Sequence, residues 1–299
     1  MRCYWLLSLT ERAYALQRGH SLGFRGHPAS HTKHLRKRFK LDEFDDFPNL
    51  QLKLFDSVDE DFVDCWNGRC AGRTCRKLNA DKAAKLYHSF MEDYDQQDEQ
   101  PESVPTPQIA ASEEGTGESE YERKKVQKAD VNVTRQWLLN RLWLTCLSHG
   151  LVSVDSQHAP LQATHAVDIA RRTLKIVERL TMPAMEAHGI GFAEKLYDIA
   201  MTLIVIYKDF PSVIESAQAQ EEQRQQQKPA AVGLSPQTPI FGQKDLTSIH
   251  FILQAYVEFL RVFRHGEHPF LGKLIDQIKE LPQQQHDIFD TFLQQLGVF

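Results

Sequence analysis

The chain has 299 residues, of which 41% are hydrophobic and 25% are charged, and its formal net charge is −5 at pH 7. This length suits one large domain or two modest ones with a sizeable core, and the composition is ordinary for a soluble globular protein. The mildly acidic total argues against a surface that binds nucleic acid throughout, although it allows a local basic patch. The most apolar later stretch, residues 199–207, is too short to cross a bilayer, which needs about 20 residues, so no membrane role is expected.

The first predicted helix covers residues 3–18 and is followed by Gly19, a typical helix-ending residue. Its expected apolar face consists of Leu6, Leu9, Ala13 and Leu16, and Trp5 and Tyr14 broaden this face. Shorter helical pieces are expected over residues 49–91. A longer helix is expected over residues 134–149, with Gly150 as its stop. Its expected buried face consists of Leu139, Leu142, Trp143, Cys146 and Leu147.

Three later segments show apolar residues at steps of three and four, which predicts amphipathic helices. The clearest starts at Thr164, taken as a capping residue, and its apolar face is Ala166, Ile169, Ala170, Thr173, Leu174, Val177 and Leu180. The next follows Gly191 and carries Phe192, Leu196, Ile199, Ala200, Leu203 and Ile206. The third starts at Asp245 and carries Leu246, Ile249, Leu253, Tyr256, Phe259, Leu260 and Phe263. Two shorter helices are expected over residues 270–281 and 285–296.

Two polar segments interrupt this helical pattern. Residues 95–128 are rich in Glu, Gln, Ser and Pro, and residues 218–243 are Gln-rich and then Pro-rich. Neither can bury enough apolar surface to offset its ordering entropy, so both are expected to be disordered inserts. Because no alternating strand pattern is present, the sequence predicts an all-α helical bundle. Its expected parts are helical residues 1–94, the insert 95–128, central helices in 129–217, the insert 218–243 and C-terminal helices in 244–299.

The five cysteines are Cys3, Cys65, Cys70, Cys75 and Cys146. An odd number spread over a long chain indicates a reducing compartment rather than a disulfide framework. Three of them stand five residues apart in the segment CWNGRCAGRTC, whereas structural zinc sites usually pair cysteines two to four residues apart and need four ligands. No fourth ligand lies nearby in the sequence. Inert thiols are therefore expected, and no metal site is predicted.

No motif in the chain predicts an enzyme. The segment His188–Glu194 lacks the third glycine of a dinucleotide-binding loop and does not follow a strand. No phosphate-binding Walker loop and no G-x-S-x-G nucleophile motif is present. Catalytic and cofactor-binding residues are therefore not predicted. The tryptophans Trp5, Trp137 and Trp143 can line a pocket between helices, but aromatic residues at helical spacing more often belong to the core.

One basic run supports a functional hypothesis. Residues 31–40, HTKHLRKRFK, contain five cationic side chains: Lys33, Arg36, Lys37, Arg38 and Lys40. A run of this kind can act as a nuclear import signal or contact phosphates. The alternative is a solvated loop whose charge is balanced by the acidic residues that follow.

Four blocks of the sequence, taken in order, resemble the regulatory, or middle-homology, region of fungal binuclear zinc-cluster transcription factors. Residues 2–19, RCYWLLSLTERAYALQRG, are similar to a family helix of the form R-x-x-W-x-L-x-x-T-E-R-A-Y-A-L-Q. Residues 52–67, LKLFDSVDEDFVDCWN, are similar to its L-F-x-x-x-D-x-x-F-x-x-x-W-N block. Residues 129–150, ADVNVTRQWLLNRLWLTCLSHG, are similar to its A-D-x-x-V-T-x-Q-W-L helix, which ends in H-G. Residues 185–200, MEAHGIGFAEKLYDIA, are similar to its M-E-x-H-G-x-G-x-x-E-K-L-x-D-I-A block.

This resemblance implies a nuclear, all-α regulatory domain that controls RNA polymerase II transcription. The most similar subgroup activates maltose, amylolytic or secondary-metabolite genes. The implied partners are other transcription regulators, a homologous full-length factor and a small-molecule inducer. In the family, an N-terminal cluster of six cysteines binds zinc and DNA. This chain has no counterpart of that cluster, so we expect a regulator truncated at its start, without a cofactor of its own and in contact with promoter DNA only indirectly.

Two other hypotheses compete with this interpretation. The first is a helical co-regulator or scaffold that does not bind DNA and pairs with a full-length factor. The second is an enzyme of helical fold, which should carry an aspartate-rich metal motif on a long helix. The nearest candidate for such a motif, Asp42–Asp46, lies in a short acidic segment instead, which argues against an enzyme.

Overall fold

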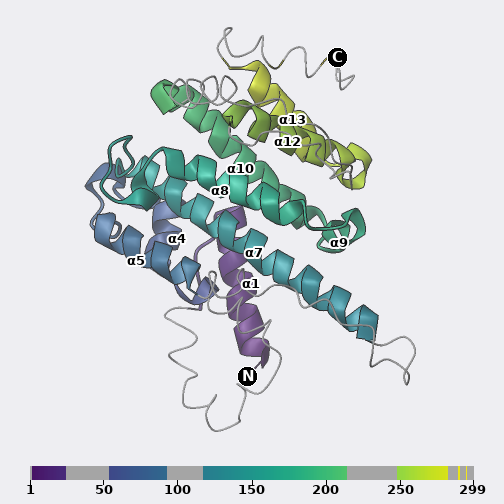
Figure 1. The fold of residues 1–299 in the computed structure, drawn as a ribbon. Helices are drawn as coiled ribbons and strands as arrows, with labels where there is room; N and C mark the ends of the chain where they lie inside the picture. Colours follow the sequence, from purple (N-terminus) through teal and green to yellow (C-terminus); the bar gives the residue numbers. More distant parts are fainter. Residues whose placement is uncertain are drawn as a thin grey trace. The chain divides into compact units, whose positions relative to one another are not determined.

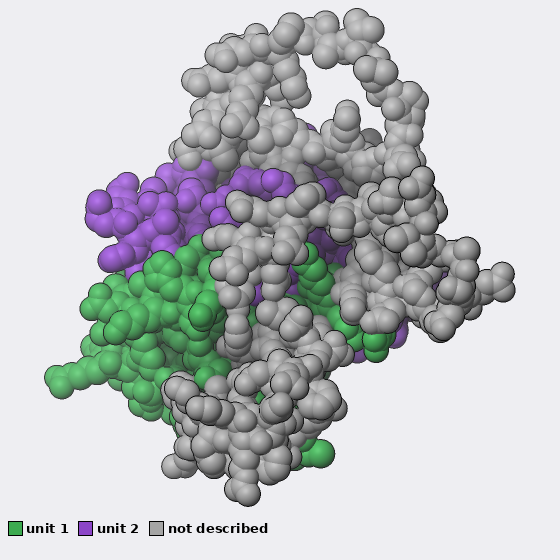
Figure 2. Space-filling model, turned by 60° about the horizontal axis from the view of Figure 1, so that its bottom comes forward, with its two compact units in different colours: residues 1–131, 141–151 green, residues 132–140, 152–299 purple. Residues whose placement is uncertain are grey.

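The computed structural model describes residues 2–24, 54–92, 117–213 and 248–281, together with residues 289 and 294. The chain divides into two compact units, one of Met1–Val131 with Arg141–Leu151 and the other of Asn132–Asn140 with Val152–Phe299 (Figure 2). Within the described ranges the secondary structure is helical, and β pairing is limited to one isolated bridge between Ser153 and Gln162. The prediction of an all-α protein is confirmed.

The first unit is built from short helices and from both ends of one long helix (Figure 1). Its elements are α1 (Arg2–Arg18), α4 (Glu60–Trp66), the 3-10 turn η2 (Gly72–Thr74), α5 (Ala80–Met91) and the ends of α7 (Gly117–Ser148). Side-chain caps start two of these helices. Asp59 accepts a hydrogen bond from the N–H of Phe62 over 2.7 Å, and Asn79 accepts one from the N–H of Lys82 over 2.9 Å. The helical pieces expected within residues 49–91 are thus present.

The long helix α7 begins earlier than the sequence predicts. Residues 117–128 were assigned to the first polar insert, yet they form the first turns of α7. These residues lack a large apolar face, but Glu, Arg, Lys and Gln are strong helix formers. The intrinsic helix propensity of these residues therefore extends α7 toward its N-terminus. A prediction from hydrophobic periodicity alone puts the start of this helix too late in the sequence.

The buried face of α1 also differs from the prediction. Leu6 is 57% exposed, Tyr14 is exposed and Leu9 and Ala13 are half-buried, so that of the predicted face only Trp5 and Leu16 are buried. The residues of α1 that are buried are Trp5, Ser8, Arg12, Ala15 and Leu16. Their spacing is helical, but two of them are polar. The face predicted from hydrophobic periodicity is consequently rotated relative to the side of this helix that is buried.

Hydrogen bonds to backbone carbonyls allow the guanidinium of Arg12 to be buried. Its Nε donates to the carbonyl oxygen of Val58 over 3.0 Å, and a second guanidinium N–H donates to the carbonyl oxygen of Ser8 over 3.3 Å. Burial lowers the pKa of Arg12, while the nearby carboxyl of Asp56 acts in the opposite direction. A buried polar group is tolerated when it is paired in this way, and the bond to Val58 joins α1 to the segment that precedes α4.

Trp66, at the end of α4, makes the second connection to α1. Its indole N–H donates to the carbonyl oxygen of Leu16 over 2.9 Å, and the guanidinium of Arg141 lies 4.0 Å from the centre of its ring. The next residue, Asn67, donates to the carbonyl oxygen of His20 over 3.1 Å. One tryptophan therefore contacts α1 and the C-terminal part of α7 within the first unit.

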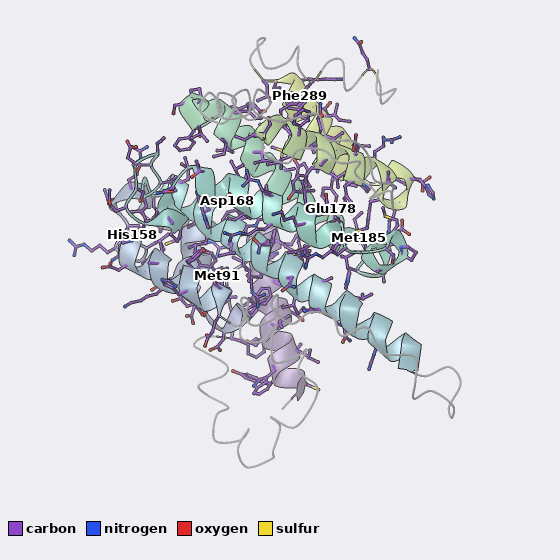
Figure 3. The ribbon with its side chains drawn as sticks, in the orientation of Figure 1. Met91, His158, Asp168, Glu178, Met185 and Phe289 are labelled. Carbon is purple, nitrogen blue, oxygen red and sulfur yellow. The ribbon has the colours of Figure 1, made fainter. Side chains whose placement is uncertain are left out.

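The second unit is a helical bundle around α10. Its elements are η3 (Ala159–Leu161), α8 (Thr164–Val177), α9 (Met182–Ala187), α10 (Ile190–Asp209), α12 (Ile249–Val262), η4 (Phe263–Gly266) and α13 (Pro269–Lys279). Helix α10 lies between α8 on one side and the pair α12 and α13 on the other (Figure 1). The hydroxyl of Tyr256 in α12 donates to the carbonyl oxygen of Ala170 in α8 over 3.0 Å. Met185 of α9 is buried, and the neighbouring Glu186 accepts a hydrogen bond from the N–H of Arg264 over 3.0 Å (Figure 3).

The apolar faces predicted for the helices of this unit are confirmed. Every described residue of the three predicted stripes is buried, whereas Leu246 lies outside the described residues. Three details differ. Thr164 is the first residue of α8 rather than its cap, α10 begins at Ile190, and Leu147 of α7 is half-buried.

Several predictions fall on residues that the structure does not describe. These are the insert over residues 95–116, the insert over 218–243, the acidic segment Asp42–Asp46, the helix over 285–296 apart from two of its residues, and the basic side chains Lys33, Arg36, Lys37, Arg38 and Lys40. Among the helices that are described, none has both the length and the apolar character that crossing a membrane requires.

Candidate metal centre

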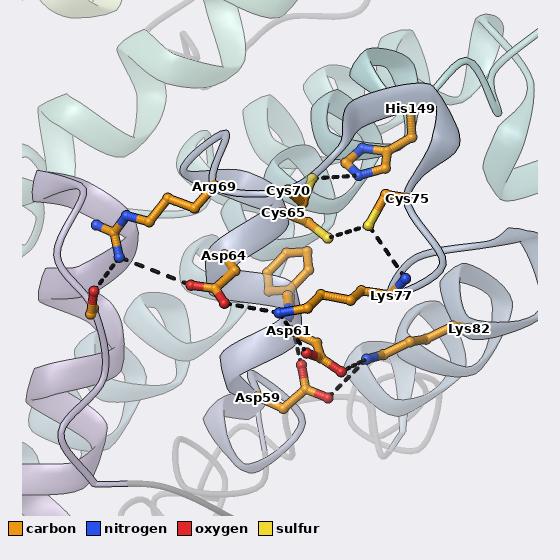
Figure 4. A network of polar contacts seen from close by, with 12 residues as sticks. Asp59, Asp61, Asp64, Cys65, Arg69, Cys70, Cys75, Lys77, Lys82 and His149 are labelled. Atoms are coloured by element: carbon orange, nitrogen blue, oxygen red, sulfur yellow. Dashed lines mark hydrogen bonds and ion pairs between the residues drawn. The ribbon is translucent and has the colours of Figure 1, made fainter.

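Three cysteines and one histidine of the first unit lie together (Figure 4). Cys65 belongs to the last turn of α4, Cys70 follows that helix, and Cys75 comes directly after η2. His149 follows the last residue of α7. The chain between α4 and α5 and the end of α7 therefore bring the four side chains to one place.

The distances among the four side chains are close to those in a tetrahedral metal site. The Sγ atoms of Cys65 and Cys75 are 3.7 Å apart, and the Sγ of Cys70 is 3.2 Å from Nε2 of His149. All four potential ligand atoms lie within 4.8 Å of one another. Tetrahedral zinc with Zn–S bonds of about 2.3 Å separates its sulfur ligands by about 3.8 Å. A disulfide would bring two sulfurs to about 2.05 Å, and the cysteines of this cluster are free thiols.

The cysteine-bearing segment is held by polar contacts rather than by a hydrophobic core. None of residues 67–77 is buried. Lys77 forms ion pairs with Asp61 at 3.2 Å and with Asp64 at 3.1 Å, and Arg69 bonds the carbonyl oxygen of Gly19 (Figure 4). Exposed ion pairs of this kind contribute little to stability. The segment consequently depends on its contacts with α4 and with His149 for a fixed conformation.

The orientation of His149 is set by the end of α7. Its Nδ1 lies 2.7 Å from the carbonyl oxygen of Thr145, so Nδ1 carries the hydrogen and donates it to that oxygen. The lone pair of Nε2 is then directed toward the cysteines. The following residue, Gly150, has φ +71° and ends the helix immediately after the histidine. Histidines that bind metals typically donate their second ring N–H to a carbonyl or carboxylate in this way.

The local electrostatics favour a thiolate at Cys75. Burial acts to raise its pKa, but the hydrogen bond from the N–H of Lys77 at 3.3 Å, together with contacts from further neighbours, lowers the pKa of Cys75 to about 6. The pKa of Cys65 is raised, first by burial and then by its hydrogen bond with Cys75. The pKa values of the two thiols are thus shifted in opposite directions, and Cys75 is the sulfur of this pair that loses its proton more readily.

The sequence places no fourth ligand near the three cysteines. The structure brings a fourth candidate, His149, beside them, although it lies 79 residues along the chain from Cys70. His149 is buried at the end of the helix predicted over residues 134–149. The sequence did contain one indication of a metal site. Three cysteines lie in a basic, glycine-containing segment that has few apolar residues to form a core. The remaining cysteines, exposed Cys3 and buried Cys146, are not members of this cluster.

The three tryptophans, His188 and His20 make packing or ring-stacking contacts outside the cysteine cluster. Trp5, Trp137 and Trp143 are all buried, as expected for core residues. His188 stacks on Phe192, with ring centres 5.6 Å apart, beside the helix start at Gly189. His20 stacks on Tyr14 with ring centres 5.1 Å apart. Within the described residues, the cluster of three cysteines and His149 is the one group with the composition of a metal site.

No protein-family model matches this chain. Neither curated proteins nor solved structures give a match. The candidate metal centre is therefore supported by its geometry, and the similarity of the four sequence blocks to fungal regulators remains a hypothesis.

Proposed function

We propose that this chain is the regulatory portion of a fungal transcription regulator that acts in the nucleus on RNA polymerase II transcription of a metabolic or secondary-metabolite gene cluster. The observation that carries the proposal is that the blocks that resemble the zinc-cluster family meet in pairs, the first with the second in the first unit and the third with the fourth in the second unit. Their most specific residues, rather than arbitrary apolar ones, make the contacts between blocks.

The third and fourth blocks meet through polar residues of α7 and α10. The indole N–H of Trp137 donates to Oδ2 of Asp198 over 2.8 Å. One turn earlier, Nζ of Lys195 donates to Oγ1 of Thr134 over 2.6 Å. All four residues belong to the resembling motifs, and all four lie in the second unit. These two hydrogen bonds give a physical reason why tryptophan and threonine in the third block occur together with aspartate and lysine in the fourth.

The first and second blocks meet in the first unit in a similar manner. The tryptophan and asparagine that end the second block, Trp66 and Asn67, donate to carbonyl oxygens of Leu16 in the first block and of His20, the residue that follows this block. These contacts support the interpretation that the blocks are parts of one helical regulatory domain. Bundles of this kind can bind a partner helix or a small inducer, and transcription regulators or a full-length homologue are the proposed partners.

A tethering experiment tests the regulatory function. The full chain is fused to an unrelated DNA-binding domain and produced in a fungal host that carries a reporter under the matching operator. We expect reporter output to change several-fold relative to the DNA-binding domain alone. The double substitution Trp137→Phe with Asp198→Asn should reduce this effect, whereas Val154→Ala, at a site 46% exposed, should not. Reporter output equal to that of the DNA-binding domain alone, with the fusion present at normal levels, would contradict the proposal.

Nuclear entry and DNA binding are tested separately. We expect replacement of Lys33, Arg36, Lys37, Arg38 and Lys40 by Ala to exclude the chain from the nucleus, and unchanged nuclear entry would refute the import role of this run. We also expect the purified chain not to bind DNA sequence-specifically. A tight, salt-resistant complex with one promoter fragment would contradict this expectation and show that the chain itself binds DNA sequence-specifically.

A further inference from the structure

We propose that Cys65, Cys70, Cys75 and His149 bind one Zn²⁺ ion, which stabilises the first unit. This inference is independent of the proposed regulatory function, because a structural zinc site serves any activity of the fold. It is also distinct from the DNA-binding zinc cluster of the resembling family, which uses six cysteines and no histidine.

The ligand set fits zinc in both number and kind. Three sulfurs and one imidazole nitrogen fill four tetrahedral positions, and a mixed sulfur and nitrogen site of this geometry favours zinc over the hard cations Mg²⁺ and Ca²⁺. The sulfur–sulfur distance of 3.7 Å and the sulfur–nitrogen distance of 3.2 Å leave room for an ion between the ligands. Because the protein supplies all four ligands, no position remains open for water or substrate. The site is accordingly structural rather than catalytic.

The surroundings of the cluster complete the site. The ring N–H of His149 is held by the carbonyl oxygen of Thr145, which fixes the nitrogen that faces the sulfurs. The N–H of Lys77 donates to the sulfur of Cys75 over 3.3 Å, as backbone amides do around metal-bound thiolates. These two contacts orient one histidine ligand and one cysteine ligand without any help from the metal.

Basic residues in the segment offset the net negative charge that zinc and three thiolates carry together. Three thiolates and Zn²⁺ together carry a single net negative charge. The segment over residues 69–77 contains no acidic residue and four basic ones: Arg69, Arg73, Arg76 and Lys77. The side chain of Arg73 extends close to Gly150, next to the histidine ligand. The charge of the segment therefore suits an anionic metal centre.

Zinc binding would supply the stability that this segment lacks. Between Trp66 and Leu78 no side chain is buried, and only one turn of 3-10 helix is present. A segment with so little apolar surface needs another source of order, and metal coordination provides it in small protein elements. The ion would join the end of α4, the segment before α5 and the end of α7. Its loss should consequently loosen residues 67–78 first.

The test begins with the full chain purified under reducing conditions from zinc-supplemented cells. Elemental analysis is expected to find about one Zn²⁺ per chain. After removal of zinc with a chelator, Co²⁺ alone is titrated into the apoprotein. We expect the visible spectrum of tetrahedral Co²⁺ with thiolate ligands, and its displacement on addition of Zn²⁺. Hydrogen exchange of residues 67–78 should be faster in the apoprotein than in the zinc-bound protein.

Three variants separate zinc binding from general effects on folding. Cys70→Ser should lose most of the zinc, whereas His149→Cys, which offers four sulfur ligands, should retain it. Cys3→Ser is the matched control, because Cys3 is exposed and lies outside the cluster, and it should bind zinc like the original chain. If Cys70→Ser does not fold, the metal content of the unaltered chain and of His149→Cys still decides the question.

Specific results would overturn the proposal. A folded chain that contains no zinc and gives no thiolate-to-cobalt absorption would do so. Equal zinc contents in the unaltered chain and a folded Cys70→Ser variant would also overturn it. A third such result is a disulfide between Cys65 and Cys75 in protein isolated under reducing conditions, because that bond would remove two of the ligands.

Discussion

The indole N–H of Trp137 donates a hydrogen bond to Oδ2 of Asp198 over 2.8 Å and joins α7 to α10. The tryptophan is 1% exposed, and the carboxylate is half-buried. The side-chain amide of Asn140 donates to the backbone carbonyl of the same aspartate over 3.3 Å. Asp198 therefore accepts hydrogen bonds from two turns of α7, and the contact fixes the register of the two helices in the second unit.

Removal of the indole donor should weaken the second unit. Trp137→Phe keeps an aromatic ring but leaves the carboxylate of Asp198 without this partner. Because hydrogen bonds to charged groups contribute about 1.5–3 kcal/mol, we expect the free energy of unfolding to fall by about 2 kcal/mol. Urea unfolding followed by circular dichroism measures it. Asp198→Asn keeps an acceptor and should cost less, and an unfolding curve for Trp137→Phe that coincides with the original would contradict the assignment.

A second prediction concerns the buried guanidinium of Arg12. Arg12→Met preserves the aliphatic part of the side chain but removes the donors to the carbonyl oxygens of Val58 and Ser8. Buried acceptors left without partners cost about 1–3 kcal/mol, so the free energy of unfolding should decrease by about 2 kcal/mol. Thr10→Ala, at an exposed position of the same helix, should change it by less than about 0.5 kcal/mol. Equal effects of the two substitutions would show that the bonds of Arg12 contribute nothing.

Hydrophobic periodicity predicted the second unit well because its helices are amphipathic in the ordinary sense. In α8, α10 and α12 the buried side is mostly apolar and its residues recur at helical spacing, so spacing alone identified the core. The same method gave the wrong face for α1. There Ser8 and Arg12 point inward and are satisfied by hydrogen bonds, whereas Leu6 and Leu7 are more than half exposed. A sequence pattern does not reveal that a buried arginine will find carbonyl oxygens from a distant segment.

The corrected face of α1 leads to a third prediction. Leu16 is 2% exposed and Leu6 is 57% exposed, although both belonged to the predicted stripe. Leu16→Ala should lower the free energy of unfolding by about 2–4 kcal/mol, because it removes buried methyl groups and leaves a cavity. Leu6→Ala should change it by less than about 0.5 kcal/mol. Chemical denaturation of both variants checks this difference. A larger loss of stability for Leu6→Ala than for Leu16→Ala would support the apolar face predicted from the sequence instead.

The candidate metal centre was missed for a different reason. Its three cysteines were visible in the sequence, but spacing rules for zinc ligands describe local pairs. The fourth ligand, His149, comes from the end of α7 and reaches Cys70 only through the fold of the first unit. A histidine followed by glycine at a helix end predicts a cap as readily as a ligand. A contact between residues so far apart in the chain can be recognised only once the tertiary structure is known.

The pH dependence of stability depends in part on His165 at the start of α8. Burial, assisted by the positive charge of Arg172, lowers the pKa of His165 to about 4 from its ordinary value of 6.5. Between these two values the unfolded chain binds a proton that the folded chain does not. Stability should therefore fall as the pH decreases from about 6.5 to about 4, and this contribution should not change further below that range.

The substitution His165→Gln isolates this effect. The shift corresponds to at most about 3 kcal/mol, so the original chain should lose up to that much more stability than the variant between pH 7 and pH 4. Urea unfolding at several pH values measures both curves, and His158→Gln, the same change at an exposed position, is the matched control. Parallel curves for the original chain and His165→Gln would mean that the folded protein accommodates a protonated His165. Burial at the start of α8 would then not exclude the charge.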